Sequence, residues 1–476
     1  MAPPSSLIPD APPQDAEMPR GPSPRRALLR ELARALGGAA LLPFRTNDYL
    51  YRHDDLVQEL VTDLRSRPAE TEEPAASRPH LPDRPLRIFL SCAEASGEIH
   101  ATGLARELVR QAQAAGAPAP ELRGLGGDRL RAAGVQTIAD PVGRAAMGFE
   151  GMFSSLPYYS RLIEDTARSF RDWRPDLFLP LDSPALHVPL AHVAKRYGLP
   201  VVHFITPQYW GWAPWRTAGY RKAVDRALTI LPFERDWFTR RGIEVRHVGH
   251  PLLDRLRDVP RRSPEAPSGD TLCILPGSRA RVIERNLPWM LSIAADLQRR
   301  FPGAPVRVVQ ETEEHRTRIE TILASARSDA QLSCGDLHGD LRDARCALSV
   351  SGTVLIDVLH HGLPCVVIYR LKGHMERWMS RNLLTAPYFA SINLLAGEEV
   401  VPEFAFMGQG PRAEIQHKLE LAYGDAAWRT RCQTGLARAT RRLGPPGAVA
   451  RAAGHALEIL DRGPGIAPQR TILGLP

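Results

Sequence analysis

Short apolar runs alternate with longer amphipathic segments from residue 86 onward, and this alternation restricts the possible folds more than any other feature of the chain. Residues 86–91 (LRIFLS) and 200–205 (PVVHFI) are typical of buried strands, whereas 97–116 and 185–198 have the apolar spacing of helices. Strands that alternate with helices predict parallel sheets joined by right-handed crossovers. The chain is therefore expected to have an α/β fold.

The alternation occurs in two series, which a connecting stretch at 248–270 separates. With 476 residues, the chain is too long for a single hydrophobic core. We predict two doubly wound Rossmann-like domains that face a cleft, an N-terminal domain at 85–250 and a C-terminal domain at 251–476. The last helices of the second region are expected to pack back on the first domain.

Residues 1–84 form an N-terminal extension whose composition differs from that of the two domains. Its first 26 residues are rich in Pro and Ser, so the extension is expected to be partly disordered. The rest is predicted to be a basic amphipathic helix at 26–44 that ends near Gly37 and Gly38, a second helix at 53–67 and a linker at 68–85.

The formal net charge of +8 comes mainly from arginine. An arginine surplus suits acidic partners such as phosphates, nucleic acid or anionic lipid. A GC-rich genome, whose codons favour arginine, explains the same surplus equally well. The charge alone therefore does not choose a partner.

The apolar runs and cysteines indicate a compartment. No run reaches the roughly 18 apolar residues of a membrane span, and the N-terminal stretch has no apolar region typical of a secretory signal. None of the six cysteines forms a C-x-x-C pair, and Cys273, Cys346 and Cys365 lie in strand-like runs. We expect free, buried thiols and a cytoplasmic location.

The stretch LCILPGSRAR at 272–281 is a strand that breaks into small residues and a cation. Gly277 and Ser278 lie where the strand enters a helix, and Arg279 is beside them. Backbone N–H groups and the helix dipole favour a phosphate at such a place, and arginine binds phosphate with two parallel hydrogen bonds. The loop lacks the G-x-x-x-x-G-K pattern of a Walker loop.

A second loop, SVSGTVLIDVLHHGLP, repeats this arrangement with Ser351, Gly352 and Thr353 at a strand end and Asp357 one helical turn later. Hydroxyls at a helix start plus a carboxylate suit the phosphate and ribose of a nucleotide. Two such loops in one domain predict a nucleotide diphosphate site. The sequence has no D-x-D pair, no H-E-x-x-H and no Cys/His cluster, so we expect no metal and no other cofactor.

Two strand ends in the first domain carry carboxylates. Glu94, Ser96 and Gly97 lie at a strand-to-helix turn, where ligands bind in α/β sheets, although Ser96 as a simple helix cap fits the same spacing. Asp182 follows another strand, and its carboxylate is a candidate to take a proton from an attacking hydroxyl. A helix cap before Pro184 is the alternative interpretation of Asp182.

Two further segments of the first domain are rich in large apolar side chains. The segment FITPQYWGWAPWR contains Trp210, Trp212 and Trp215, which either line an apolar or sugar-stacking wall or pack into the core. The segment MGFEGMFSSLPYYSRL contains Met147 and other apolar residues, followed by Arg161. Apolar side chains beside cations suit membrane contact, and packing into the core is again the alternative.

Together these motifs resemble the lipid-A-disaccharide synthases, which are inverting glycosyltransferases with a two-domain GT-B fold. The resemblance runs from about residue 86 to about residue 403 and rests on the order of the motifs. They are AEASGE, GGDRLRAAG, MGFEGM, PDLFLPLDSP, HFITPQYWGW, LPFE at 231–234, GHP at 249–251, LPGSR, SGT, YRLK and NLLAG at 393–397.

The resemblance implies transfer of sugar from UDP-2,3-diacylglucosamine to the 6-hydroxyl of 2,3-diacylglucosamine 1-phosphate, which gives a β-1,6-linked disaccharide 1-phosphate and UDP. It implies that Asp182 is the general base and that Arg279 belongs to the phosphate loop. It implies that residues 351–353 form the nucleotide loop, that Asn393 lies beside the site and that Glu94 and Ser96 belong to the first glycine-rich turn. It also implies acylated substrates, peripheral contact with the cytoplasmic face of the inner membrane, no nucleic-acid partner and a possible homodimer.

The chain departs from the family pattern at three places. The usual D-A-P-D-F-N is DSPALH here, so Ala185 replaces the second acid. Asp357 stands where the family usually has glutamate, and Val282 stands near the place of a family glutamate, with Glu284 following. Two alternative functions stay open: a UDP-N-acetylhexosamine 2-epimerase, which shares the architecture, and a non-catalytic relative that binds the acylated sugar nucleotide or the membrane.

Overall fold

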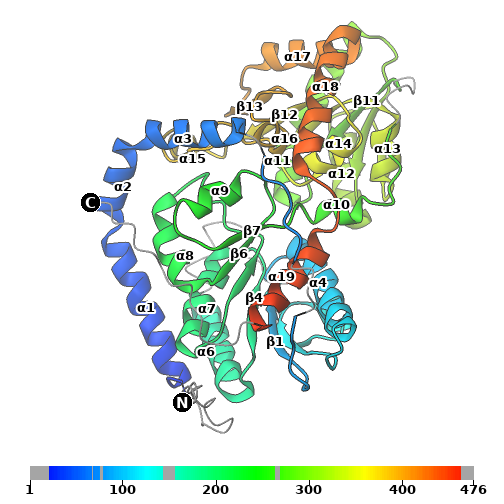
Figure 1. Ribbon diagram of the computed structural model, residues 1–476. Coiled ribbons are helices and arrows are strands. Elements are labelled where there is room, and N and C mark those ends of the chain that lie inside the picture. The colour runs from blue at the N-terminus through cyan, green and yellow to red at the C-terminus, as the bar shows by residue number, and fades with distance from the viewer. Residues whose placement is uncertain (1–20, 67, 75–78, 143–155, 263–268, 462–476) are drawn as a thin grey trace, which may run out of the picture.

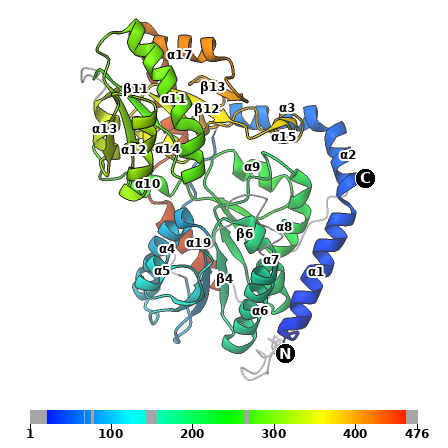
Figure 2. The same ribbon diagram turned by 180° about the vertical axis from the view of Figure 1, so that it is seen from behind.

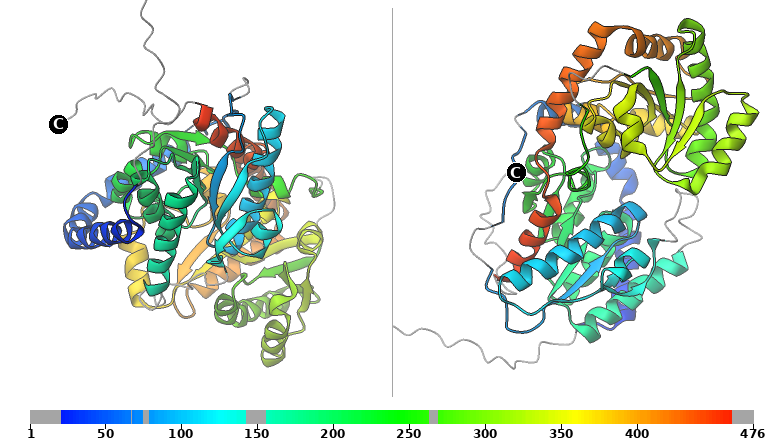
Figure 3. Two further views of the ribbon diagram at one scale, coloured as in Figure 1. Left: turned by 90° about the horizontal axis from the view of Figure 1, so that it is seen from below. Right: turned by 90° about the vertical axis from the view of Figure 1, so that its right-hand side faces the viewer.

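The computed structural model describes residues 21–66, 68–74, 79–142, 156–262 and 269–461 (Figure 1). Its strands are all parallel and divide between two α/β domains, which confirms the predicted fold class. Figures 2 and 3 show the two domains from behind, from below and from one side, with helices packed around the sheets of each domain.

The first domain contains two short parallel sheets that join edge to edge. The first has the order β3-β2-β1-β4 and the second β5-β6-β7, and bridges from Phe178 to Val201 and from Leu181 to Phe204 connect β4 to β5. The strands are β1 (Arg87–Ser91), β2 (Glu121–Leu125), β3 (Gln136–Ala139), β4 (Leu177–Pro180), β5 (Val202–Phe204), β6 (Arg226–Thr229) and β7 (Val245–His247). The helices are α4 (Ala95–Ala114), α5 (Asp128–Ala132), α6 (Leu156–Trp173), α7 (Pro184–Arg196), α8 (Thr217–Ala223) and α9 (Glu234–Thr239).

The second domain has one six-stranded sheet with the order β10-β9-β8-β11-β12-β13, which is the doubly wound Rossmann order 3-2-1-4-5-6. The strands are β8 (Thr271–Leu275), β9 (Val306–Gln310), β10 (Gln331–Cys334), β11 (Ala344–Val350), β12 (Cys365–Arg370) and β13 (Glu403–Phe406). The helices are α11 (Ala280–Arg300), α12 (Arg316–Ser325), α13 (Leu337–Asp343), α14 (Val354–His360), α15 (His374–Asn382), α16 (Ser391–Ala396), α17 (Arg412–Gly424) and α18 (Ala426–Leu443). A short helix, α10 (Leu252–Arg255), lies in the connection between the domains.

The strand order decides where a ligand site forms. In each domain the chain winds outward in one direction from the first strand and then in the other from the fourth, so the order reverses between β1 and β4 and between β8 and β11. Ligands of doubly wound sheets bind in the crevice at this reversal, beyond the carboxyl ends of the strands. The predicted loops after β1, β4, β8 and β11 all lie at these reversal points.

The N-terminal extension is more helical than predicted. Helix α1 (Pro24–Ala40) ends two residues after Gly38, near the predicted end, and α2 (Leu42–Tyr51) and α3 (His53–Arg65) follow. A proline in the first turn of α1 and of α2 favours helix starts at these places.

The extension contacts both domains (Figure 1). Helix α1 packs on α6 and α7 of the first domain, and α3 contacts α9 of the first domain and α16 of the second. Glu31, buried in α1, forms an ion pair with Arg196 of α7, whose distance is 2.6 Å. Asp63 and Glu59 of α3 bind the guanidinium of Arg240, just after α9. The extension is therefore part of the folded body.

The C-terminal helix α19 (Ala448–Asp461) returns to the first domain and packs along α4 (Figure 3). Arg226 of β6, which is fully buried, donates hydrogen bonds to the carbonyl oxygen of His455 at 2.8 Å and to the carboxylate of Glu458 at 3.2 Å. The six cysteines are free thiols, five of them buried. None of the described helices is both long and apolar enough to span a bilayer.

Candidate functional site

The turn that follows β4 has a left-handed backbone at two successive non-glycine residues. Asp182 has φ 49° and Ser183 has φ 44°. A side chain disfavours this conformation, at a cost on the order of 1–3 kcal/mol for each residue, so neighbouring groups must hold the turn in place. The N–H group of Asp182 donates to the carbonyl oxygen of Phe204 at 3.0 Å.

Two buried histidines hold the carbonyl oxygen of Asp182. It accepts hydrogen bonds from Nδ1 of His187 at 2.7 Å and from Nε2 of His203 at 3.1 Å. Since a carbonyl oxygen only accepts, Nδ1 of His187 and Nε2 of His203 must each carry a hydrogen. The other nitrogen of His187, Nε2, then accepts a hydrogen bond from the Ser91 hydroxyl at 2.8 Å. Burial lowers the pKa of His187 to about 4 and that of His203 to about 3, which keeps both rings neutral near neutral pH.

The carboxyl group of Asp182 is partly buried, and its pKa is raised to about 6. Burial is the larger cause, because the charged form loses hydration, and the negative charge of Glu94 adds to the effect. A carboxylate with a pKa close to neutrality suits a general base, since it is ionised at neutral pH and still binds a proton readily.

An ion pair crosses from one domain to the other at the same place. The guanidinium of Arg279 lies 3.9 Å from the carboxylate of Glu94. Both side chains are well exposed, so the pair contributes little to stability. It shows instead that the Arg279 loop of the second domain faces the β1 and β4 ends of the first, which brings Asp182, Glu94 and Arg279 into one site.

The loop after β8 requires glycine at position 277. Gly277 has φ 107°, and a Cβ atom there would lie 2.7 Å from Cγ1 of Val282 and 3.3 Å from Cγ2 of Val350. Ser278 is exposed, and Arg279 precedes α11 without capping it through its side chain. The first N–H groups of α11 therefore have no side-chain cap beside this exposed cation, which is the arrangement that binds phosphate.

The loop after β11 combines one bonded hydroxyl with two exposed residues. The hydroxyl of Ser351 donates to the carbonyl oxygen of Phe389 at 2.8 Å, so it fixes the loop against the segment before α16. Gly352 and Thr353 are exposed, and Thr353 precedes α14 without a side-chain cap. Both residues are therefore accessible to a ligand at the start of α14.

Asp357, one turn into α14, lies in a charged cluster at the edge of the connection between the domains. Burial raises its pKa to about 7, the positive charge of Arg255 opposes this shift, and the negative charge of Glu311 adds to it. Nε2 of His338 lies 4.0 Å from its carboxylate. A carboxylate held out of water without a hydrogen bond from a side chain is suited to bind a ligand hydroxyl.

The structure places Asn393 in the core and not at an open surface. Its amide nitrogen donates to the carbonyl oxygen of Val401 at 2.8 Å and to the carboxylate of Glu403 at 3.1 Å, and its oxygen accepts from the N–H groups of Val400 and Val401. Glu403 also accepts from the N–H groups of Phe389 and Ala390. Asn393 and Glu403 therefore fix the segment before α16, which in turn holds Ser351 through the carbonyl oxygen of Phe389.

The remaining residues predicted for the first domain fall into different environments. Glu94, with no side-chain capping bond, is the N-cap residue of α4, so Ser96, in the first turn and exposed, is not the cap. Gly97, behind it, is buried. Trp210 is only 3% exposed, and its Nε1 donates to the buried carboxylate of Glu234 at 2.9 Å, so it packs in the core.

Trp212 is exposed, with the guanidinium of Arg216 4.6 Å from its ring centroid. Trp215 packs edge-to-face on Tyr49 of the extension, with 5.0 Å between ring centroids. Met147 and its apolar neighbours up to residue 155 lie outside the described residues. Val282 packs against the Gly277 loop, and Glu284 forms an ion pair with Arg318. Of the three tryptophans in this loop, Trp212 is the most exposed.

His187, His203 and Glu403 were not predicted from the sequence. His203 is a polar residue inside the apolar run PVVHFI, and such a residue usually has a specific buried partner. This pattern indicates that His203 has a buried hydrogen-bond partner, but it does not indicate which group that partner is.

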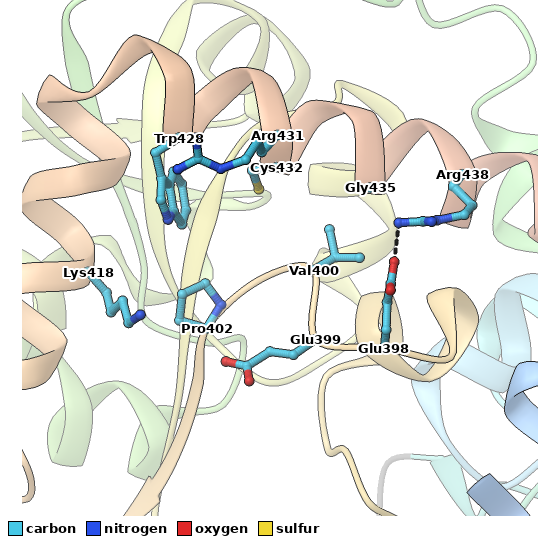
Figure 4. A pocket seen from close by; sticks show the side chains of 10 residues that line it. All are labelled: Glu398, Glu399, Val400, Pro402, Lys418, Trp428, Arg431, Cys432, Gly435 and Arg438. Carbon is cyan, nitrogen blue, oxygen red and sulfur yellow. Dashed lines mark hydrogen bonds and ion pairs between the residues drawn. The ribbon is translucent and has the colours of Figure 1, made fainter.

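A cavity of about 340 Å³ lies elsewhere, between α18 and the segment before β13 (Figure 4). Trp428, Lys418 and the paired side chains of Glu398 and Arg438 line part of it. It contains none of the predicted site residues. No three His, Cys, Asp or Glu side chains gather into a possible metal site anywhere in the described part of the chain.

Comparison with protein families matches residues 88–438 to the family described as lipid-A-disaccharide synthetase. The lipid-A-disaccharide synthase of Myxococcus xanthus is 32% identical over 399 residues, which cover 80% of this chain and 99% of that protein. The corresponding protein of Geobacter sulfurreducens is 30% identical over 382 residues, which cover 79% of this chain and 98% of that protein.

Solved structures share the fold at low sequence identity. The S. aureus MnaA–UDP co-structure aligns with a TM-score of 0.51 and 10% identity over 76% of this chain and 94% of that chain. The calicheamicin glycosyltransferase CalG4 aligns with a TM-score of 0.50 and 15% identity over 82% of this chain and all of that one. These likenesses support the two-domain fold alone.

The raised pKa of Asp182 makes a prediction for stability. Its folded-state pKa of about 6 lies above the ordinary value of 3.8, so the folded chain binds more protons between these values and loses stability as pH rises through this window. Asp182→Asn cannot ionise. We expect its free energy of unfolding to exceed that of wild type by about 2–3 kcal/mol at about pH 8. This difference should vanish near pH 4.

Urea unfolding at both pH values measures this difference, with Asp172→Asn, at the exposed end of α6, as the matched control. Equal pH dependence of stability in wild type and Asp182→Asn would contradict the desolvated carboxyl group.

Proposed function

Because the chain belongs to the lipid-A-disaccharide synthase family, we propose that it joins UDP-2,3-diacylglucosamine to 2,3-diacylglucosamine 1-phosphate. The products are a β-1,6-linked disaccharide 1-phosphate and UDP. The observation that carries the proposal is the partly buried Asp182, with a pKa of about 6, in a site that Glu94 and Arg279 share across the two domains.

Asp182 acts as the general base. As the 6-hydroxyl oxygen of the acceptor attacks the anomeric carbon, the Asp182 carboxylate takes the hydroxyl proton, and the bond from that carbon to the UDP oxygen breaks. Attack from the face opposite UDP inverts the configuration. The rate should therefore fall as pH drops below about 6, because the protonated carboxyl group cannot accept the proton.

Arg279 binds the diphosphate and stabilises the negative charge that grows on it as UDP leaves. The uncapped first turns of α11 and α14, with Gly277, Ser278, Gly352 and Thr353, supply N–H groups to the same phosphates. The donor then replaces Glu94 as the partner of Arg279. Asp357 binds a ribose hydroxyl, whereas Ser351 and Asn393 hold the loops in position.

The acceptor lies against the first domain, at 85–250, beside Glu94, Ser96 and the exposed Trp212. The nucleotide lies against the second, at 251–476. Both substrates carry acyl chains, which favours work at the cytoplasmic face of the inner membrane as a peripheral protein. The proposal also includes that the protein forms a homodimer.

The first prediction concerns Asp182→Ala. With purified protein and both acylated substrates, the variant should lose at least about a hundredfold in kcat, because it has no proton acceptor. Its affinity for UDP should change little, since the carboxyl group does not bind the nucleotide. Coupled detection of UDP and chromatography of the disaccharide measure the rate, and calorimetry measures UDP affinity. Activity that persists in the variant would remove Asp182 from this role.

The second prediction concerns Arg279→Ala. Loss of one charge-assisted contact, roughly 1.5–3 kcal/mol, should weaken UDP binding by about 10- to 150-fold and also lower kcat. Arg299→Ala, at the exposed opposite end of α11, is the matched control and should leave both unchanged. Wild-type UDP affinity in Arg279→Ala would contradict the phosphate role.

The same assay separates the alternative functions. A UDP-N-acetylhexosamine 2-epimerase would convert the soluble sugar nucleotide without an acylated acceptor. A non-catalytic relative would bind UDP and the acylated substrates without releasing UDP. Disaccharide formation that depends on Asp182 excludes both.

A further inference from the structure

Large apolar side chains are exposed on one part of the described surface. Eight of the fourteen exposed large hydrophobic residues lie on α1 and α2 of the extension or at the residue between them, and three more lie on or just after α15. We call this set the apolar platform. Its members are Leu29, Leu32, Leu36, Leu41, Leu42, Phe44, Leu50, Tyr51, Met375, Trp378 and Leu384. An exposed apolar surface of this kind marks an interaction site.

Helix α1 has one face buried against the first domain and another that is apolar but exposed. Its buried residues, Pro24, Ala27 and Glu31, face the first domain, where the helix packs on α6 and α7. The exposed Leu29, Leu32 and Leu36 recur at spacings of three and four residues, which places them in one stripe on the other side of the helix. The contact with the domain is complete without this stripe, so the stripe is free for a partner.

The parts of the platform from the extension and from the second domain are joined. The hydroxyl of Tyr49, in α2, donates to the carbonyl oxygen of Leu383 at 2.7 Å, and Nε2 of His53 lies 3.0 Å from the carbonyl oxygen of Leu384. Figures 1 and 2 both show α15 beside α2 and α3. Helix α2 and the end of α15 are therefore neighbours in space.

The charges around the platform are mostly positive. The exposed cations within 21–52 and 371–384 are Arg25, Arg26, Arg30, Arg34, Arg45, Arg52, Lys372, Arg377 and Arg381. Within 21–52 and 371–384 the acidic residues are only Glu31, which is buried and paired, Asp48 and Glu376. Apolar side chains flanked by arginine are the pattern of helices that lie in the plane of a membrane surface.

We infer that the apolar platform docks on an anionic lipid bilayer, with α1, α2 and α15 lying along its surface. Positive charge beside exposed Leu, Phe and Trp complements negative headgroups and the acyl region below them. A second copy of the chain fits less well, because a twofold contact would place this cationic surface against itself.

The platform also adjoins the acceptor side of the proposed site. Tyr49 packs on Trp215, and Thr385, just after Leu384, donates its hydroxyl hydrogen to the carbonyl oxygen of Trp210. Docking would therefore hold the tryptophan loop next to the layer in which acylated substrates lie. This last step rests on the proposed function, whereas the docking itself does not.

The test uses the full-length protein and two kinds of vesicle, phosphatidylcholine alone and phosphatidylcholine with about one third phosphatidylglycerol. Cosedimentation measures binding. We expect binding mainly to the anionic vesicles. The fourfold variant Leu29→Ser, Leu36→Ser, Phe44→Ser, Tyr51→Ser should bind at least about tenfold more weakly, because its apolar contact is lost.

A charge variant, Arg26→Glu with Arg30→Glu and Arg45→Glu, keeps the proposal testable if the fourfold variant does not fold. It should also lose at least about tenfold in binding to anionic vesicles. The matched controls lie elsewhere on the surface: Ile138→Ser for the apolar change, and Arg110→Glu with Arg299→Glu and Arg316→Glu for the charge change. Both controls should bind as wild type does.

Transfer activity distinguishes failure of docking from failure of the proposed function. Platform variants should keep wild-type rates on detergent-dispersed substrates and lose at least about tenfold on substrates embedded in anionic vesicles. A wild type that binds vesicles but makes no disaccharide would overturn the function and not the docking. Wild-type vesicle binding by both platform variants, or self-association that these substitutions abolish, would overturn the docking.

Discussion

The candidate site depends on how one peptide group is held. The carbonyl oxygen of Asp182 accepts hydrogen bonds from His187 and His203, and this pair fixes a left-handed turn that a chain avoids without such support. The turn leaves the side chain of Asp182 partly buried beside Glu94, which raises its pKa to about 6. Because burial keeps both histidines neutral at physiological pH, they act as fixed hydrogen-bond donors and add no charge that would lower this pKa.

Topology places the other groups opposite this turn. Each domain reverses its strand order at one point, and the loops after β1 and β4 in one domain and after β8 and β11 in the other lie at these points. The contact between Glu94 and Arg279 shows that the loops face each other. The extension, through α1 and α3, and the C-terminal helix α19 tie the chain together around them. An acid on one side and a guanidinium with open helix ends on the other form a suitable arrangement for displacing a nucleotide diphosphate.

The sequence alone predicts the two-domain α/β fold and the strand-end loops, because apolar periodicity and the rule for parallel sheets are local signals. It does not show which residues beside those loops are buried. Trp210 and Asn393 pack in the core because Glu234 and Glu403 bind them, and these contacts join segments 24 and 10 residues apart. The histidine clamp on Asp182 likewise joins a helix to a separate strand. Only Tyr49 of helix α2 is buried, and its contacts with Leu383 and Trp215 join segments far apart in the sequence.

The most direct test of this account compares kcat and KM of His187→Asn and His187→Ala with those of wild type. The amide nitrogen of asparagine occupies nearly the same place as Nδ1 of histidine, so His187→Asn can still donate to the Asp182 carbonyl oxygen, and we expect its kcat within about tenfold of wild type. His187→Ala should lose about a hundredfold in kcat with KM for the donor little changed, because the base is misplaced while the nucleotide site is intact. Wild-type kcat in His187→Ala, or a loss that appears only in KM, would contradict the account.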